Sequence, residues 1–228
     1  MNERETILAR VREGLKIIAP FPGHGPEAAE PVSGVAPSQN ARHWLPMVGN
    51  TFEARLELFR KNAADLRADF YLVNNLEELS KLLVDLRDFE GWKKIGIHSG
   101  DLTDHAARAL ALPVCSTDHP YKVTDLETCD AGLTECDALI AQTGTVLVTS
   151  RSAGGRALSV LPPHHVVLAR RDQLIADLPD AFSLLNKKYA SDYPSFISFI
   201  TGPSRTGDIE RILVLGAHGP KKLSIFCL

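Results

Sequence analysis

A short turn between two apolar segments, Gln142–Thr145, carries side chains suited to binding a small anion. Gly144 permits the positive φ angle that a two-residue hairpin turn needs, so a hairpin alone would explain this sequence. A functional reading is also open, because the amide of Gln142 and the hydroxyls of Thr143 and Thr145 surround a bare stretch of backbone. Such a turn suits a carboxylate or a phosphate.

A second turn, Thr201–Asp208, follows an apolar segment and precedes a short helix that we predict over Thr206–Ile212. If the apolar segment is a strand of a parallel sheet, this turn lies at the carboxyl end of the strand, where ligands commonly bind. The helix start would offer free N–H groups, and Arg205 would add a fork of donors. The simpler interpretation is a helix start capped by Ser204 or Thr206, with a surface arginine. The candidate ligand-binding residues of this turn are Gly202, Ser204, Arg205, Thr206 and Asp208.

Three single residues outside these turns also have side chains that could do chemistry. His218, in Gly216–Pro220, could act as an acid, a base or an anion donor, although a loop histidine is more often only solvated. Glu135 precedes the first turn and could act as a base or nucleophile. More commonly, such a residue is simply an exposed loop acid. Arg156 follows two glycines in the loop Ser152–Leu161 and could clamp an anion. The candidate catalytic residues are therefore Glu135 and His218.

The usual signatures of nucleotide, metal and hydrolase sites are absent from the sequence. There is no Walker loop, no G-x-S-x-G elbow and no H-E-x-x-H motif, and no G-x-G-x-x-G fingerprint follows a predicted strand. Cys115, Cys129, Cys136 and Cys227 form no C-x-x-C pair. We therefore expect buried thiols, with neither a metal site nor an iron–sulfur cluster in this chain.

Composition and charge exclude several classes of protein. The chain has 228 residues, of which 44% are hydrophobic and 23% charged, as in an ordinary globular protein. A net charge of -3 lacks the basic surplus of a nucleic-acid-binding protein. No apolar run reaches the roughly 18–20 residues that span a bilayer, and Met1–Leu15 lacks the apolar core of a signal peptide. We expect a cytoplasmic protein with neither a membrane span nor a nucleic-acid partner.

The elements that must position the two turns divide into an N-terminal arm, residues 1–48, and one main domain, residues 49–228. Apolar periodicity predicts a helix over Glu3–Ile18, and the Pro- and Gly-rich stretch Pro20–Pro46 predicts a linker. In the first half of the main domain, predicted strands alternate with helices, which favours a parallel α/β sheet with helices on its faces. The closely spaced strands within Ala138–Thr149 predict a hairpin.

The individual elements follow the apolar pattern. Helices are predicted over Thr51–Leu66, Glu77–Asp88 after an N-cap at Asn75, Thr103–Leu110, and from about Asp172 to Leu185. Strands are predicted over Phe70–Val73, Lys94–His98, Val114–Ser116, His165–Ala169, Phe196–Thr201 and Leu223–Phe226.

Two long motifs resemble the signatures of a known family. The run from Gly132 to Val148, which contains the first turn, resembles the central motif of the LUD-domain proteins. The run Phe199–Glu210, followed by Gly216–Lys221, resembles their C-terminal signature. The resemblance covers roughly Gly49 to the C-terminus, and two motifs in the right order make it specific.

This resemblance implies a Rossmann-like fold similar to the NagB/RpiA/CoA-transferase group, a three-layer sheet with helices on both faces. It also implies a part in an iron–sulfur-dependent system that oxidises L-lactate to pyruvate. In that system the clusters belong to partner subunits, and this chain carries no cofactor. We expect the chain to bind a small carboxylate or phosphate at its two turns. Whether it catalyses a step or is an accessory subunit, and whether it forms a homo-oligomer, stays open.

Two other functions fit the same residues. The chain could be a standalone enzyme of the NagB/RpiA-like fold that acts on a phosphosugar, an acyl-CoA or a folate, with Glu135 as the base or nucleophile. It could also be a regulatory protein that senses carboxylates.

Overall fold

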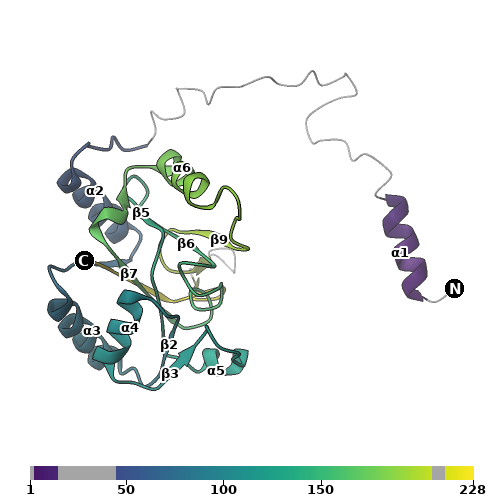
Figure 1. Ribbon diagram of the computed structural model, residues 1–228, viewed down its shortest axis with the longest axis horizontal. Coiled ribbons are helices and arrows are strands. Elements are labelled where there is room, and N and C mark those ends of the chain that lie inside the picture. The colour runs from purple at the N-terminus through teal and green to yellow at the C-terminus, as the bar shows by residue number, and fades with distance from the viewer. Residues whose placement is uncertain (1–2, 15–44, 207–213) are drawn as a thin grey trace. The chain divides into compact units, whose positions relative to one another are not determined.

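The computed structural model describes residues 3–14, 45–206 and 214–228, and the chain divides into two units. The first unit, Met1–Trp44, contributes helix α1 (Glu3–Gly14), which agrees with the start of the helix expected there. The second unit, Leu45–Leu228, holds every other described element (Figure 1). The expected linker falls almost wholly outside the described residues, and so does candidate residue Asp208.

The centre of the second unit is a six-stranded sheet in which every strand runs parallel to its neighbours, in the order β1-β12-β7-β4-β2-β3. Strand β7 is buried along its whole length, as expected for a parallel strand covered on both faces. The bounds are β1 Asp69–Leu72, β2 Ile95–Ile97, β3 Val114–Ser116, β4 Ala131–Thr134, β7 His164–Ala169 and β12 Lys222–Cys227.

One face of this sheet is covered by α3 (Leu76–Glu90) and α4 (Asp101–Leu110), which lie side by side in Figure 1. Their apolar side chains, such as Leu83 of α3, pack on sheet residues such as Ile95 in one buried cluster. The predicted N-cap of α3 is confirmed, because the side chain of Asn75 accepts a hydrogen bond from the backbone N–H of Glu78 at 2.8 Å.

The other face is covered by helix α2 and by a second sheet of four strands in the order β8-β5-β6-β9. Helix α6 covers the outer face of this second sheet, and the short helix α5 packs in a separate small cluster. The bounds are α2 Phe52–Asp65, α5 Val123–Glu127, β5 Ala138–Ile140, β6 Thr145–Thr149, β8 Leu174–Ile175, α6 Leu178–Tyr189 and β9 Ile197–Ile200. The α/β class with a central parallel sheet flanked by helices is confirmed, and the second sheet is an addition to it.

The hairpin predicted within Ala138–Thr149 is confirmed, because β5 and β6 pair antiparallel. Strand β9 also forms where a strand was expected, but it pairs antiparallel with β6 in the second sheet. The expectation that the second turn follows a strand of the parallel sheet is therefore wrong. An apolar run of four residues suits either sheet, so the sequence alone does not decide which strand it pairs with.

Two predicted helix starts are also wrong. Arg205–Thr206 form strand β10, which pairs antiparallel with β11 (Val214–Leu215), so no helix begins at Thr206, and residues 207–213 lie outside the described ranges. The helix expected from Asp172 instead begins at Leu178, after a 3₁₀ turn (Arg171–Gln173) and β8. Its start follows from local chemistry, because Asp177 caps it and a proline occupies its first turn.

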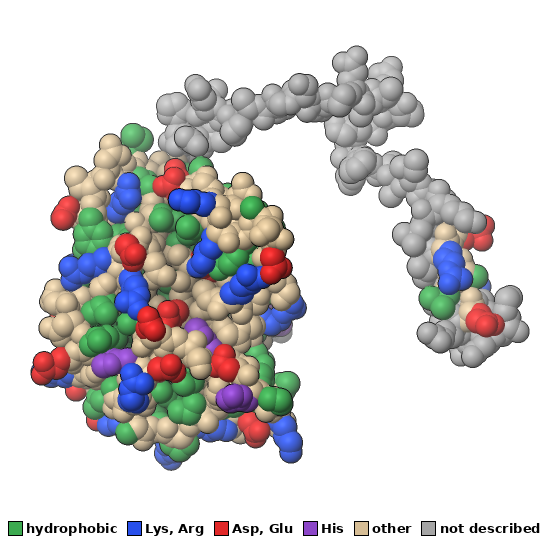
Figure 2. Space-filling model, in the orientation of Figure 1, with side chains coloured by type: hydrophobic (Ala, Val, Ile, Leu, Met, Phe, Trp, Pro, Cys, Tyr) green, Lys and Arg blue, Asp and Glu red, His purple; other side chains and the backbone are tan. Residues whose placement is uncertain are grey.

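The four cysteines are free and buried, which confirms the expected buried thiols. Among the described residues, no three His, Cys, Asp or Glu side chains are placed to hold a metal ion. No helix within the described part is long and apolar enough to span a membrane. On the face of the second unit shown in Figure 2, acidic, basic and apolar side chains are interspersed.

Candidate functional site

The two predicted turns lie next to each other at one end of the second sheet. The first turn leads into β6 and the second follows β9, and Val146 of β6 pairs with Ile200 of β9. The hydroxyl oxygens of Thr145 and Thr201 are 2.8 Å apart, so the turns are joined by a direct hydrogen bond. Segments that are 56 residues apart in the chain thus form one surface.

The first turn is fastened to helix α2. The side-chain amide of Asn62 donates to the carbonyl oxygens of Ala141 and Gln142, both at 2.9 Å. Gly144 has a φ of 64°, and a Cβ there would lie 2.9 Å from Asn62 backbone carbon. A glycine is therefore needed both for the backbone conformation and for the close approach to the helix.

The side chains of the first turn point mostly into the protein. Thr145 is 2% exposed, and the hydroxyl of Thr143 is buried without a hydrogen-bond partner among the described residues. The side chain of Gln142 is half-buried and donates to the carbonyl of Pro46 at 3.1 Å. The turn therefore shapes the surface, and exposed charges come from the second turn and its neighbours.

The second turn packs against the end of α2 and against the segment that leads to β12. Gly202 has a φ of 84°, and a Cβ there would lie 2.9 Å from the carbonyl oxygen of Leu66. The backbone N–H of Ser204 donates to Pro220 at 2.9 Å, and that of Gly216 donates to Ser204 at 3.0 Å. These bonds bring Gly216–Pro220, the loop that contains His218, to the second turn.

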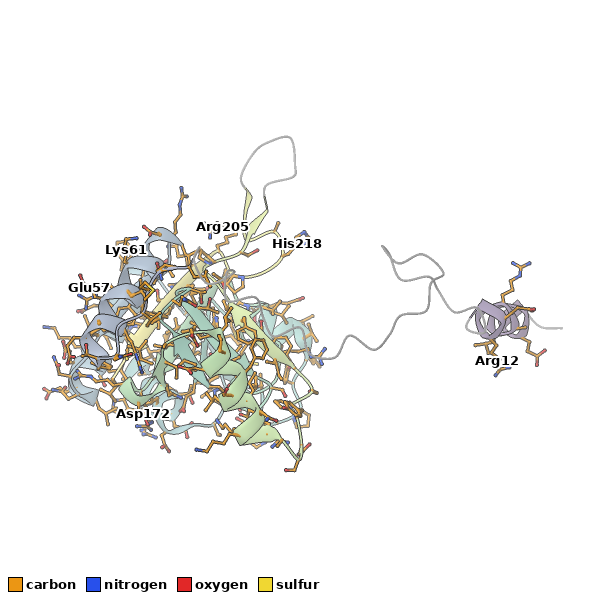
Figure 3. All side chains as sticks on the ribbon, turned by 90° about the horizontal axis from the view of Figure 1, so that it is seen from above. Arg12, Glu57, Lys61, Asp172, Arg205 and His218 are labelled. Atoms are coloured by element: carbon orange, nitrogen blue, oxygen red, sulfur yellow. The ribbon has the colours of Figure 1, made fainter. Side chains whose placement is uncertain are left out.

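Arg205 and His218 are the candidates of this surface with exposed nitrogen donors, and Figure 3 shows them on the same side of the domain, near the base of the β10–β11 hairpin. Neither side chain forms an ion pair with another residue that the structure describes. Both are therefore available to an anion from solvent. The candidate Thr206 contributes its backbone to β10.

Glu135 lies away from this surface, at the carboxyl end of β4. Its Oε1 accepts the backbone N–H of Leu102 at 2.8 Å, and its own N–H donates to Nε2 of His98 at 3.1 Å. Glu135 thereby caps α4, whose N-cap residue Gly100 has no side chain to do so. The second turn contacts the loop before β12, where the parallel strands begin. Glu135 follows β4, so it lies where the parallel strands end, on the opposite side of the sheet from the second turn.

Arg156 also lies apart from the two turns. Its guanidinium donates to the carbonyl of Ser195 at 3.2 Å and lies 5.7 Å from the ring centroid of Phe196. Both partners precede β9, whereas Thr201 follows it, so the strand separates Arg156 from the second turn. Arg156 instead lines an apolar pocket of about 260 Å³.

Residues 121–228 match the sequence model of the LUD domain. This C-terminal part of the chain is similar to the LUD domain. Both motifs that resembled the family lie within the matched residues, and so do the two turns and His218. The crystal structure of a DUF162 family protein from Deinococcus radiodurans aligns with a TM-score of 0.62 at 20% identity, over 80% of this chain and 99% of that chain, which shows a common fold.

Several curated relatives of this chain are named Lactate utilization protein C. The relative from Halalkalibacterium halodurans is 38% identical over 43% of this chain and 44% of its own length. The relative from Deinococcus radiodurans is 31% identical over 51% of this chain and 54% of its own length. These alignments span about half of each relative. A longer alignment, to the Geobacillus kaustophilus relative, is 25% identical over 84% of this chain and 86% of the relative.

The part of the chain that matches the LUD domain also contains a buried polar cluster that sequence reasoning missed. The side chain of Asp137 is 0% exposed, and its Oδ1 accepts from Lys188 Nζ at 2.6 Å and from the Tyr189 hydroxyl at 2.7 Å. Burial alone would raise the pKa of Asp137, but hydrogen bonds from Lys188, Ser152 and Tyr189 hold it below the usual value. This cluster ties α6 to the second sheet. An aspartate directly before an apolar strand was the signal for it in the sequence.

Proposed function

We propose that this chain takes part in lactate utilisation and binds a small organic anion, such as a hydroxy acid, beside its two turns. The names of the curated relatives support the process. The observation that carries the binding site is the hydrogen bond between Thr145 and Thr201. It joins the two family motifs into one surface, beside which the side chains of Arg205 and His218 are exposed.

The chemistry of a hydroxy acid matches this surface. A carboxylate accepts two parallel hydrogen bonds from a guanidinium, which Arg205 offers, and a further one from an imidazole N–H of His218. If Thr145 donates its proton to Thr201, the exposed hydroxyl of Thr201 is free to donate to the ligand. The described hydroxyl and cationic groups bind and orient such a ligand.

Oxidation of a hydroxy acid to a keto acid removes two electrons and two protons. We propose that iron–sulfur partner subunits in the cytoplasm accept the electrons and that the protons pass to solvent. The thiols of this chain do not suit a cluster. Cys136 and Cys227 pack in the core between the two sheets, whereas Cys115 and Cys129 pack beside α5. Burial raises the pKa of Cys129 and of Cys227 to about 11, which disfavours the thiolates that a cluster needs. This chain then serves as the ligand-binding member of the system.

Isothermal titration calorimetry with the full chain and L-lactate, pyruvate or inorganic phosphate tests the binding site. We expect Arg205→Gln and His218→Gln each to weaken binding of the preferred anion by roughly fivefold or more. Arg108→Gln is the matched control, because it removes an exposed cation of α4 on the other side of the parallel sheet. Absence of binding by any anion, or equal binding by all four proteins, would reject the proposed site.

Deletion of the gene, followed by growth on L-lactate as the carbon source, tests the process. We expect growth on L-lactate to be lost and restored by the wild-type gene. Purification of the tagged chain from lactate-grown cells should bring down iron–sulfur proteins. Normal growth of the deletion strain on L-lactate would reject a necessary part in lactate utilisation.

A second candidate function rests on the position of Glu135. The carboxyl edge of a parallel sheet is the usual ligand site of α/β enzymes, and Glu135 lies there beside His98 and the start of α4. A standalone enzyme acting on a phosphosugar, an acyl-CoA or a folate would use Glu135 as its base or nucleophile. If Glu135→Gln left every activity and ligand affinity unchanged, this alternative would be excluded.

A further inference from the structure

Two of the buried thiols are neighbours beneath the short helix α5. Cys115 lies on β3 and Cys129 follows α5, and both belong to one small cluster with Leu126 and Leu158. Cys115 pairs in register with Gly96 of β2, so its side chain points to the same face of the sheet as a side chain at position 96 would. A Cβ at Gly96 would lie 3.7 Å from Sγ of Cys129. The thiol of Cys129 therefore fills the space above Gly96, next to Cys115.

The electrostatics of Cys129 agree with this placement. Burial is the largest cause that raises its pKa to about 11, and the next largest is the neighbouring thiol of Cys115, which is also a hydrogen-bond partner. Sγ of Cys129 in turn donates to the carbonyl oxygen of Asp125 in α5 at 3.4 Å. A thiol influences another in this way only at short range, so the two sulfurs are neighbours.

The segment that covers these thiols is held to the domain by few contacts. From Asp118 to Thr128, every residue is exposed except Leu126. Helix α5 has five residues, which is too short for a helix to be stable without tertiary packing. Lys94 fastens the segment through hydrogen bonds to Asp125 and Thr128, both at 2.8 Å. Local opening of this segment therefore uncovers both thiols while the rest of the domain stays folded.

The other two cysteines are covered in a different way. Cys136 and Cys227 pack in the core between the two sheets. They also influence each other, because Cys227 is among the groups that, after burial, raise the pKa of Cys136. Uncovering this pair requires the two sheets to separate, which is unfolding of the whole domain. Cys136 and Cys227 are therefore an internal comparison for Cys115 and Cys129.

We propose that Cys115 and Cys129 form a reversible disulfide when the folded protein meets hydrogen peroxide. The thiolate of one cysteine attacks the peroxide and becomes a sulfenic acid, and one water is released. The second thiol then displaces the sulfenic oxygen as a second water and forms the S–S bond. The two sulfurs together lose two electrons, which reduce the peroxide. Cys115 is the expected site of the first attack, because it lies on the edge strand β3 and is 7% exposed, against 2% for Cys129.

The consequence of this bond is local. It ties the segment that carries α5 to β3, so the segment no longer opens, and it keeps the oxidation of both sulfurs at a stage that a thiol reductant reverses. None of the residues proposed to bind the anion takes part. The inference therefore stands independently of the proposed function, and it adds a modification site that responds to oxidants.

Treatment of the reduced full chain with hydrogen peroxide, without denaturant, tests this inference. We expect the number of free thiols to fall from four to two. The intact mass should fall by two hydrogen atoms, and peptide mapping should join Cys115 to Cys129. Dithiothreitol should restore all four thiols.

Cys115→Ala and Cys129→Ala should each abolish the loss of mass, whereas the matched control Cys136→Ala should retain it. The melting temperature of each reduced variant shows whether it folds, and if a variant does not fold, the peptide map of the wild type decides. Three outcomes would overturn the proposal: four free thiols after treatment, a bridge between Cys136 and Cys227, or a sulfinic acid at Cys115 without a bridge. Anion titrations of the reduced protein are a separate measurement, so the proposed function can fail while the disulfide stands.

Discussion

The hydroxyls of Thr145 and Thr201 lie 2.8 Å apart, and this contact joins the two motifs that resemble those of the LUD domain. Thr145 is buried, whereas Thr201 is exposed, so the bond runs from the core of the second sheet to its surface. A buried hydroxyl that loses its partner is left unsatisfied, which costs about 1–3 kcal/mol. The contact therefore couples the stability of the first turn to the position of the second.

We expect Thr145→Val and Thr201→Val to show an interaction free energy of about 0.5–1.5 kcal/mol in a double-mutant cycle. Valine keeps the shape of each side chain, so the cycle isolates the hydrogen bond. The measurement is urea unfolding of the wild type, both single variants and the double variant. Additive effects of the two substitutions would show that the hydroxyls do not interact.

Gly144 should be far more sensitive to substitution than Gly91. Both have a positive φ, 64° and 69° respectively, but only at Gly144 would a Cβ meet other atoms, 2.9 Å from Asn62. Gly91→Ala should cost about 1 kcal/mol for backbone strain alone. Gly144→Ala should cost at least about 2 kcal/mol more, because α2 must move. Equal losses of unfolding free energy for the two variants, measured by chemical denaturation, would mean that a Cβ at position 144 does not clash with α2.

Asn62 should act as the clamp that holds the first turn on α2. Its amide makes two hydrogen bonds, to carbonyl oxygens that begin 79 residues later in the chain. Asn62→Ala should lower the free energy of unfolding by about 1–3 kcal/mol, because both carbonyls lose a donor. Lys61→Ala, at the exposed neighbouring position, is the control and should stay within about 0.5 kcal/mol. A similar effect of both substitutions, measured by urea unfolding, would argue against the clamp.

Local sequence signals located most of these elements, because the forces that form them are local. Asn75 indicates the start of α3 because its side chain caps the helix. Gly144 indicates the hairpin because the turn needs a positive φ angle. The same reasoning failed at Thr206, where serine, threonine and glycine resemble a helix start. The partner that makes Arg205–Thr206 a strand, Val214–Leu215, is supplied by a later segment.

The site was harder to predict than the elements, because proximity between distant segments decides it. The sequence singled out both turns, but it could not show that Thr145 contacts Thr201. It missed Asn62, which reads as an ordinary polar position of a surface helix. It also offered Glu135 and Arg156 as separate candidates. The structure places Glu135 at the opposite end of the parallel strands and Arg156 at the opposite end of β9 from the second turn.

Two buried histidines should make the protein less stable in mild acid. Burial lowers the pKa of His164 to about 4 and that of His165 to about 3, from an ordinary value of 6.5. Below pH 6.5 the unfolded chain binds protons on these rings that the folded chain does not bind. The stabilisation that comes from keeping these rings neutral is therefore complete above pH 6.5 and is lost as the pH falls toward 4.

Between pH 6 and pH 5, each histidine should contribute about 1 kcal/mol per pH unit to the fall in the free energy of unfolding. His165→Gln cannot take up the proton, and its side chain can still reach the hydroxyl of Thr134, which His165 contacts at 2.9 Å. Its unfolding free energy should therefore fall less steeply than that of the wild type by about 1 kcal/mol per pH unit. Comparing slopes from urea unfolding removes any constant loss from the substitution itself. A variant that keeps the wild-type slope would show that His165 titrates alike in both states.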